Sequence, residues 1–186
     1  MDDMAFIKDY LNRYKKSLFE TDVSQQIIEL KEMLLEIKKN GKKVIIAGNG
    51  GSAAMASHVA VDFTKQGGIR AVNFNESDLI TCFANDYGYD RWVEKAIEFY
   101  SDPEDAVILI SSSGSSANML HGAEKTRELG LSLVTFTGFD AGNPVRQMGD
   151  LNFWVDSIAY NVIENIHQIW LLMACDLIIG KAEYSA

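Results

Sequence analysis

Five serines surround a single glycine in the segment Ser111-Ser112-Ser113-Gly114-Ser115-Ser116. This segment follows a continuous apolar run at 106–110 and precedes residues 117–129, whose apolar residues have helical spacing. Hydroxyl groups and backbone N–H groups at the start of a helix can hold a phosphate dianion without any lysine or arginine. A helix N-cap needs only one serine, so capping alone does not account for five. We therefore expect a phosphate-binding loop, with contacts from Ser111, Ser112, Ser113 and Ser116.

A second loop with possible chemistry is Gly48-Asn49-Gly50-Gly51-Ser52, which follows the β-branched run 44–47. Its glycines lack the Cβ atoms that would keep a ligand away from the backbone N–H groups. The loop lacks the Gly-Lys-Ser/Thr ending of a Walker A motif, and its third glycine comes too early for a dinucleotide-binding fingerprint. A tight strand-to-helix turn without a ligand is the alternative. If the loop binds a ligand, we expect contacts from Asn49, Gly50, Gly51 and Ser52.

The elements that must position these loops alternate between strands and helices. Apolar and β-branched runs predict strands at 44–47, 71–74, 106–110, 131–137 and 151–155. Helical periodicity predicts helices at 53–63, 77–85, 89–99, 117–129 and 158–179. This alternation indicates an α/β fold with a five-stranded parallel sheet. Ligands bind such a sheet beyond the carboxyl ends of its strands, where both loops lie.

Two further amphipathic helices precede the first strand. The first extends over 6–19, and the second begins after an N-cap at Thr21 or Asp22 and ends near Asn40. Helices that lie outside the α/β unit either pack against a sister subunit or cover the core of their own chain. The pattern of apolar residues leaves both alternatives open.

The composition excludes several classes of protein. With 17 basic and 26 acidic residues, the 186-residue chain has a net charge of −9, the opposite of the basic footprint of a nucleic-acid-binding protein. No uninterrupted apolar run reaches the length of about 18 residues that a membrane-spanning helix needs. The acidic first residues are unlike a signal peptide, and two cysteines are too few for a disulfide framework. We expect a cytoplasmic protein without a nucleic-acid or membrane partner.

Taken together, the motifs resemble the SIS (sugar isomerase) family of phosphosugar-binding domains, and within it the phosphoheptose isomerase branch. The segments that carry the resemblance are 48–54 with His58, 84–88, 110–116, 136–138 and 163–167. The resemblance covers nearly the whole chain and implies one SIS domain over 1–186, a flavodoxin/Rossmann-like three-layer αβα sandwich. It also implies a homotetramer with active sites at subunit interfaces, in which the helical pair 1–40 takes part in oligomer packing.

The activity that this resemblance implies is aldose–ketose isomerisation of a sugar phosphate through an enediol. The substrate would be sedoheptulose 7-phosphate and the product D-glycero-D-manno-heptose 7-phosphate, a step in heptose and lipopolysaccharide biosynthesis. An enediol route needs a base that moves a proton between adjacent carbons and an acid that serves the carbonyl oxygen. The alternative, from another class, is a non-catalytic phosphosugar-binding or regulatory SIS protein.

The resemblance places the acid–base groups on two helices. Asp62 stands where the branch has Glu, Glu164 stands where it has Gln, and both are expected to be catalytic. His167, one turn beyond Glu164, is a further catalytic candidate; the alternative is a core group, since a single histidine on a mostly apolar helix is usually buried and hydrogen-bonded. Asn85 and Asp86 lie in a loop that the family uses to hold the sugar, so we expect them to contact the substrate.

The resemblance also implies one zinc ion per subunit. The expected ligands are His58, Asp62 and Glu164, of which the first two share a helical face at positions i and i+4. Leu172 occupies the position at which the branch has a second histidine. Asp62 and Glu164 favour an enzyme, whereas Leu172 favours the binding protein.

Overall fold

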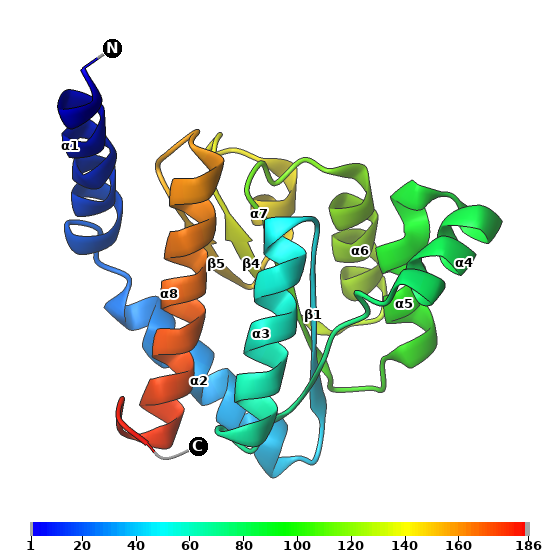
Figure 1. Cartoon of the computed structure of the whole chain (residues 1–186). Coiled ribbons are helices and arrows are strands. Elements are labelled where there is room, and N and C mark those ends of the chain that lie inside the picture. Colours follow the sequence, from blue (N-terminus) through cyan, green and yellow to red (C-terminus); the bar gives the residue numbers. More distant parts are fainter. Residues whose placement is uncertain (1, 185–186) are drawn as a thin grey trace.

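The computed structural model describes residues 2–184 and contains one five-stranded sheet (Figure 1). The strands are β1 (Lys43–Gly48), β2 (Arg70–Val72), β3 (Ala106–Ser111), β4 (Ser132–Thr137) and β5 (Leu151–Trp154). They lie in the order β2-β1-β3-β4-β5, and every pair is parallel. The predicted fold class is therefore confirmed, and the order changes direction between β1 and β3, where ligands bind in sheets of this kind.

Helices cover both faces of the sheet. One face packs against α2 (Ser24–Lys39), α3 (Gly51–Lys65) and α8 (Tyr160–Ile179), and the other against α4 (Ser77–Tyr87), α5 (Trp92–Tyr100), α6 (Ala117–Glu128) and α7 (Pro144–Met148). Alternate strand residues point to opposite faces: Ile46 and Ile108 contact the first layer, whereas Ile45 and Val107 contact the second. The continuous apolar strands predicted from the sequence are therefore buried on both sides.

The two N-terminal helices behave differently from each other. Helix α1 (Asp3–Tyr14) ends in a π-helical turn, η1 (Lys15–Phe19), and buries none of its residues; it stands apart from the sheet in Figure 1. Helix α2 buries four apolar residues against the core of its own chain. Asp22 caps α2 from the position before its N-cap residue, since its Oδ1 accepts the N–H of Ser24 at 2.9 Å. Helix α2 thus covers the chain's own core, whereas α1 contacts that core only through the half-buried Tyr10 and Tyr14.

Helix α8 is long and apolar enough to cross a membrane by length and composition alone, with a mean hydropathy of 1.5. In this fold it is a core helix. Trp170, Ile166 and Ala174 are buried, and α8 packs against α2 and α3. Its apolar character is therefore explained by its central place between two other helices.

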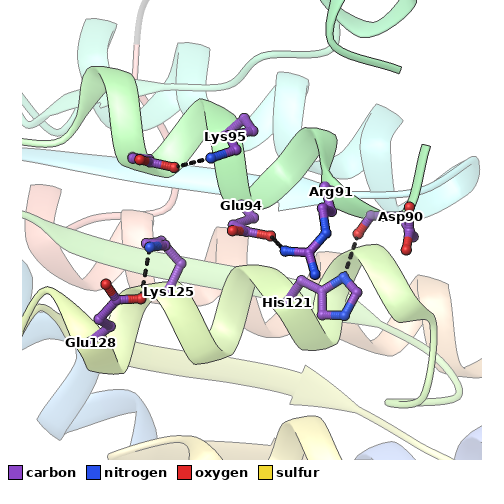
Figure 2. Close-up of polar contacts among 8 residues, drawn as sticks. Asp90, Arg91, Glu94, Lys95, His121, Lys125 and Glu128 are labelled. Carbon is purple, nitrogen blue, oxygen red and sulfur yellow. Dashed lines mark hydrogen bonds and ion pairs between the residues drawn. The ribbon is translucent and has the colours of Figure 1, made fainter. Parts of the chain in front are cut away.

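Polar contacts join the helices of the second layer. Figure 2 shows Arg91, at the end of the short 3-10 helix η2 (Tyr89–Arg91), bonded to Glu94 at 2.7 Å. His121 of α6 lies with its Nδ1 at 2.8 Å from the backbone carbonyl oxygen of Asp90 (Figure 2). A carbonyl oxygen only accepts, so the Nδ1 of His121 carries the hydrogen. These contacts hold η2 against α6, close to the loop that follows β1.

Candidate functional site

A small polar pocket of about 100 Å³ lies at the carboxyl ends of β1 and β3. It combines the two loops predicted to bind a ligand with the first turns of α8. Its walls are Asn49, Ser52, Ile110, Ser111, Ser112, Ser113, Ser116, Tyr160 and Glu164. The position agrees with the rule for parallel sheets, and seven of the predicted site residues meet here.

The serine loop is folded around its own backbone. The Ser111 hydroxyl accepts the N–H of Gly114 at 3.1 Å, and the Ser113 hydroxyl accepts the N–H of Ser115 at 3.4 Å. The Ser112 hydroxyl is buried, lines the pocket and has no hydrogen-bond partner in the protein. A buried hydroxyl without a partner costs about 1–3 kcal/mol, so its natural partner is a ligand in the pocket. Ser116 is the N-cap residue of α6, whose N-terminal end points toward the same space.

The side chain of Asn143 packs against the glycine of the serine loop. Its buried side-chain amide donates to the carbonyl oxygens of Asp140 and Gly138, at 2.8 and 3.3 Å, and its Oδ1 accepts the N–H of Arg146. Gly114, at φ +62°, lies so close to this amide that a Cβ atom there would collide with it. One side chain thus connects the turn after β4 and helix α7 to the glycine of the serine loop.

The glycine loop is shaped by close approaches. Gly50 has φ +55°, a conformation that other residues rarely adopt, and Gly51 leaves room for Glu164, whose carboxylate would collide with any Cβ atom at Gly51. Asn49 exchanges two side-chain amide hydrogen bonds with Asn118 of α6, at 2.8 and 3.0 Å. This reciprocal pair holds the end of β1 against the start of α6.

Glu164 brings a carboxyl group to the wall of the pocket. It projects from the second turn of α8 toward the first residue of α3. Partial burial raises the pKa of its carboxyl above the ordinary value. Tyr160, one turn earlier, also lines the pocket and packs edge-on against Phe139, with ring centroids 4.9 Å apart. Sequence reasoning missed Tyr160, because only the approach of α8 to the serine loop brings it there.

His58 and Asp62 form a pair further along α3. The Nε2 atom of His58 lies 3.2 Å from Asp62 Oδ2, and its Nδ1 atom lies 3.2 Å from the side-chain amide of Gln168 on α8. More than half of the His58 side chain is exposed, whereas Asp62 is mostly covered. The pair is outside the wall of the small pocket, about two helical turns from Gly51.

The structure places His167, a further catalytic candidate, in the core rather than at the pocket. Its side chain is fully buried, packed edge-on against Phe136, and its Nε2 donates to the carbonyl oxygen of Thr137 at 3.0 Å. Burial lowers the pKa of this imidazole to about 4, so it is neutral in the core. Three residues separate Glu164 from His167 on α8, and only Glu164 faces the pocket.

Asn85 and Asp86 lie outside the pocket as well. Both are exposed near the end of α4, where the Asn85 amide donates to Asp86 Oδ1 at 2.8 Å. The closest link from this region to the pocket is Tyr89, whose hydroxyl lies 3.4 Å from Asn49 Oδ1. The chain by itself therefore does not bring the two predicted sugar-binding residues to the serine loop.

The predicted zinc ligands do not come together either. Across residues 2–184, no three His, Cys, Asp or Glu side chains are grouped as a metal site. Asp62 engages one nitrogen of His58, while Glu164 lies beside Gly51 at the other end of this part of α3. Leu172 offers no ligand atom. The residues present in this chain do not fit the expected zinc site.

Comparison with known proteins places this arrangement in a family. Residues 7–138, well over half of the chain, match the SIS domain. The chain belongs to the SIS domain family. In this SIS domain the glycine and serine loops both fall inside the matched segment, whereas α8, which carries Glu164, lies beyond it.

Relatives with known names extend the likeness over the whole SIS domain. A phosphoheptose isomerase from Aliarcobacter butzleri is 30% identical over 187 residues, covering 97% of this chain and 98% of the relative. One from Helicobacter pylori is 32% identical over 170 residues, covering 88% and 87%. The solved phosphoheptose isomerase of Neisseria gonorrhoeae has a TM-score of 0.85 at 27% identity, covering 94% of this chain and 96% of that one. Within its family, the chain belongs with the phosphoheptose isomerases.

Proposed function

We propose that this protein is an aldose–ketose isomerase of sugar phosphates, with sedoheptulose 7-phosphate as its substrate and D-glycero-D-manno-heptose 7-phosphate as its product. The observation that carries the proposal is the buried, unpartnered hydroxyl of Ser112 in a pocket that also contains Glu164. This hydroxyl needs a hydrogen-bond partner, and the oxygens of a phosphate ester can provide one. The carboxyl with a raised pKa supplies acid–base chemistry in the same place.

The distance between the two parts of the site suits a seven-carbon substrate. Helices α3 and α8 run side by side, with Glu164 beside Gly51 and Gln168 beside His58. Seven residues of α3 separate Gly51 from His58, which corresponds to about 10 Å along the helix axis. An extended heptose spans about 10 Å from phosphorus to C1, because each C–C bond of about 1.5 Å advances the chain by about 1.25 Å. A heptose held by its phosphate at the serine loop can therefore extend along α3 from Glu164 toward His58 and Asp62.

In the proposed reaction, the Asp62 carboxylate removes a proton from C1 of the ketose. Glu164, whose carboxyl pKa is raised by partial burial, is the proposed acid for the carbonyl oxygen at C2, which requires the carbonyl end of the bound sugar to lie between Glu164 and Asp62. The resulting enediol takes a proton at C2 and loses the hydroxyl proton at C1, which yields the aldose. His58 holds the base, since its Nε2 lies 3.2 Å from Asp62.

We propose that the protein is a cytoplasmic homotetramer in which α1 forms part of the contact between subunits. Phe6, Ile7 and Leu11 support this, because each is more than half exposed on a helix with no fully buried residue. Exposed apolar residues along one helix are typical of a surface covered by another subunit. The exposed Asn85 and Asp86 would then be available to a neighbouring subunit's site.

The test is incubation with sedoheptulose 7-phosphate in D2O, followed by NMR. An isomerase produces aldose signals and incorporates deuterium at C2, and we expect Asp62→Asn and Glu164→Gln each to abolish both while sugar-phosphate binding is retained. Full turnover in both variants would refute the assigned roles. Binding without turnover in the wild type would instead support the phosphosugar-binding protein, the function that the missing ligand set and Leu172 favour.

A further inference from the structure

Gln168 reaches from α8 to the histidine of α3. Its side-chain Nε2 lies 3.2 Å from His58 Nδ1, on the opposite side of the imidazole ring from Asp62 Oδ2, which lies 3.2 Å from Nε2. The three side chains form a row of close polar contacts, of which the Gln168–His58 hydrogen bond joins the two helices. Gln168 is half-buried between them, so its position is defined by packing as well as by this bond.

The partners of His58 determine which of its nitrogens carries the hydrogen. A carboxylate only accepts hydrogen bonds, so Asp62 requires an N–H at Nε2. A neutral imidazole then has a lone pair at Nδ1, which must accept from a donor. The Nε2 amide group of Gln168 is that donor. The row therefore has one direction, from Gln168 to His58 to Asp62.

The register of α8 explains why residue 168 makes this contact. Positions 164, 168 and 172 succeed one another at intervals of four, so they share one face of the helix. Glu164 meets the start of α3, and Gln168 meets His58 one turn later. Leu172, the next residue on this face, has no polar atom to offer. The polar contact from α8 to His58 is therefore made by Gln168, which lies one helical turn before Leu172.

We propose that Gln168 is a positioning residue that fixes the tautomer and ring orientation of His58, and through them the carboxylate of Asp62. This inference rests on the proposed function, in which Asp62 is the base. A base that is misplaced by about 1 Å can lose about 100-fold in rate, so an amide that holds its neighbour has a measurable effect on turnover. Gln168 does not contact the serine pocket, and we expect it to have no effect on phosphate affinity.

The direct test is NMR of the imidazole nitrogens at about pH 8.5, where an ordinary imidazole is neutral. The chain has only three histidines, and His121, with its hydrogen on Nδ1, is an internal reference of the opposite tautomer. In the wild type we expect His58 to show N–H at Nε2 and a hydrogen-bonded acceptor at Nδ1. Gln168→Leu should shift the Nδ1 signal toward that of a free acceptor. Gln168→Glu, which can only accept, should convert Nδ1 to N–H.

Matched measurements make the result decisive. Gln25→Leu removes an exposed helical glutamine that is bonded to Glu29 at 3.0 Å, and should leave the signals of His58 unchanged. Identical His58 signals in the wild type and in both Gln168 variants would overturn the inference.

Turnover of sedoheptulose 7-phosphate forms a separate arm. We expect Gln168→Leu to lower kcat at least about tenfold with KM unchanged, which is the magnitude typical of residues that orient a functional side chain. An unchanged kcat in a variant whose Nδ1 signal has shifted would refute the positioning role. A wild type without turnover would refute the proposed function, while the nitrogen signals would still decide whether Gln168 orients His58.

Discussion

The neutral histidine in the core makes a quantitative prediction about stability. His167 is fully buried, and burial lowers its pKa from 6.5 to about 4. Between these values the unfolded chain binds a proton that the folded chain does not, so the free energy of unfolding decreases as the pH falls. The difference in pKa between the unfolded and folded chain corresponds to about 3 kcal/mol in the free energy of unfolding. About 2 kcal/mol of this is lost between pH 7.5 and 5.

The perturbation that isolates this effect is His167→Gln, because glutamine keeps an N–H donor for the carbonyl oxygen of Thr137 but does not titrate. Urea unfolding at a fixed protein concentration should show that the wild type loses about 2 kcal/mol more than the variant between pH 7.5 and 5. Carboxyl groups such as Glu164 titrate in both proteins and cancel in the comparison. Equal pH dependence in wild type and His167→Gln would refute the reasoning.

Three further predictions concern the pocket. Ser112→Ala removes an unpartnered buried hydroxyl, so the free energy of unfolding should stay the same or rise by about 1 kcal/mol. Calorimetry should show that the variant binds sugar phosphate at least about tenfold more weakly. Loss of stability with intact binding would contradict this. Gly114→Ala places a Cβ atom against Asn143 at a position with positive φ. Urea titrations should show a free energy of unfolding lower by more than about 1 kcal/mol. A variant as stable as the wild type would argue against the close approach. Gly51→Ala displaces the Glu164 carboxylate, so kcat should fall by more than the affinity for inorganic phosphate, and an equal fall in both would contradict the role of Glu164.

The sequence predicts the sheet well because its strands are buried on both faces. Residues 44–47 and 106–110 are continuous apolar runs followed by glycine or serine, so both strands are predicted to within one residue at each end. Strand β2 is shorter than predicted, since its pairing with β1 ends at Val72. Helix α1 and the turn η1 were predicted as one helix, because a π-helical turn continues the apolar spacing with only one extra residue.

The sequence predicts those parts of the site in which residue type alone is informative, namely the glycine loop and the serine loop. Hydroxyls and glycines at strand ends identified both loops, and the structure brings these loops together in one pocket. Helix α8 was harder, because it is apolar nearly all round and its periodicity does not show which face meets the pocket. Glu164 and His167 lie one turn apart on this helix, yet one faces the serine loop and the other the core. Tyr160 and Asn143 depend on contacts between segments far apart in sequence, which no local pattern reveals.

The hydrogen bonds of Asn143 to the turn after β4 and to α7, together with its close approach to Gly114, have a consequence for the thermodynamics of ligand capture. A loop that already has its bound shape loses little conformational freedom when an anion arrives. Complex formation should then release heat with only a small entropic penalty, and association should proceed in a single fast phase. Removing the Asn143 amide would convert this rigid cradle into a segment that orders only upon association, and a slower second phase would become visible in stopped-flow records.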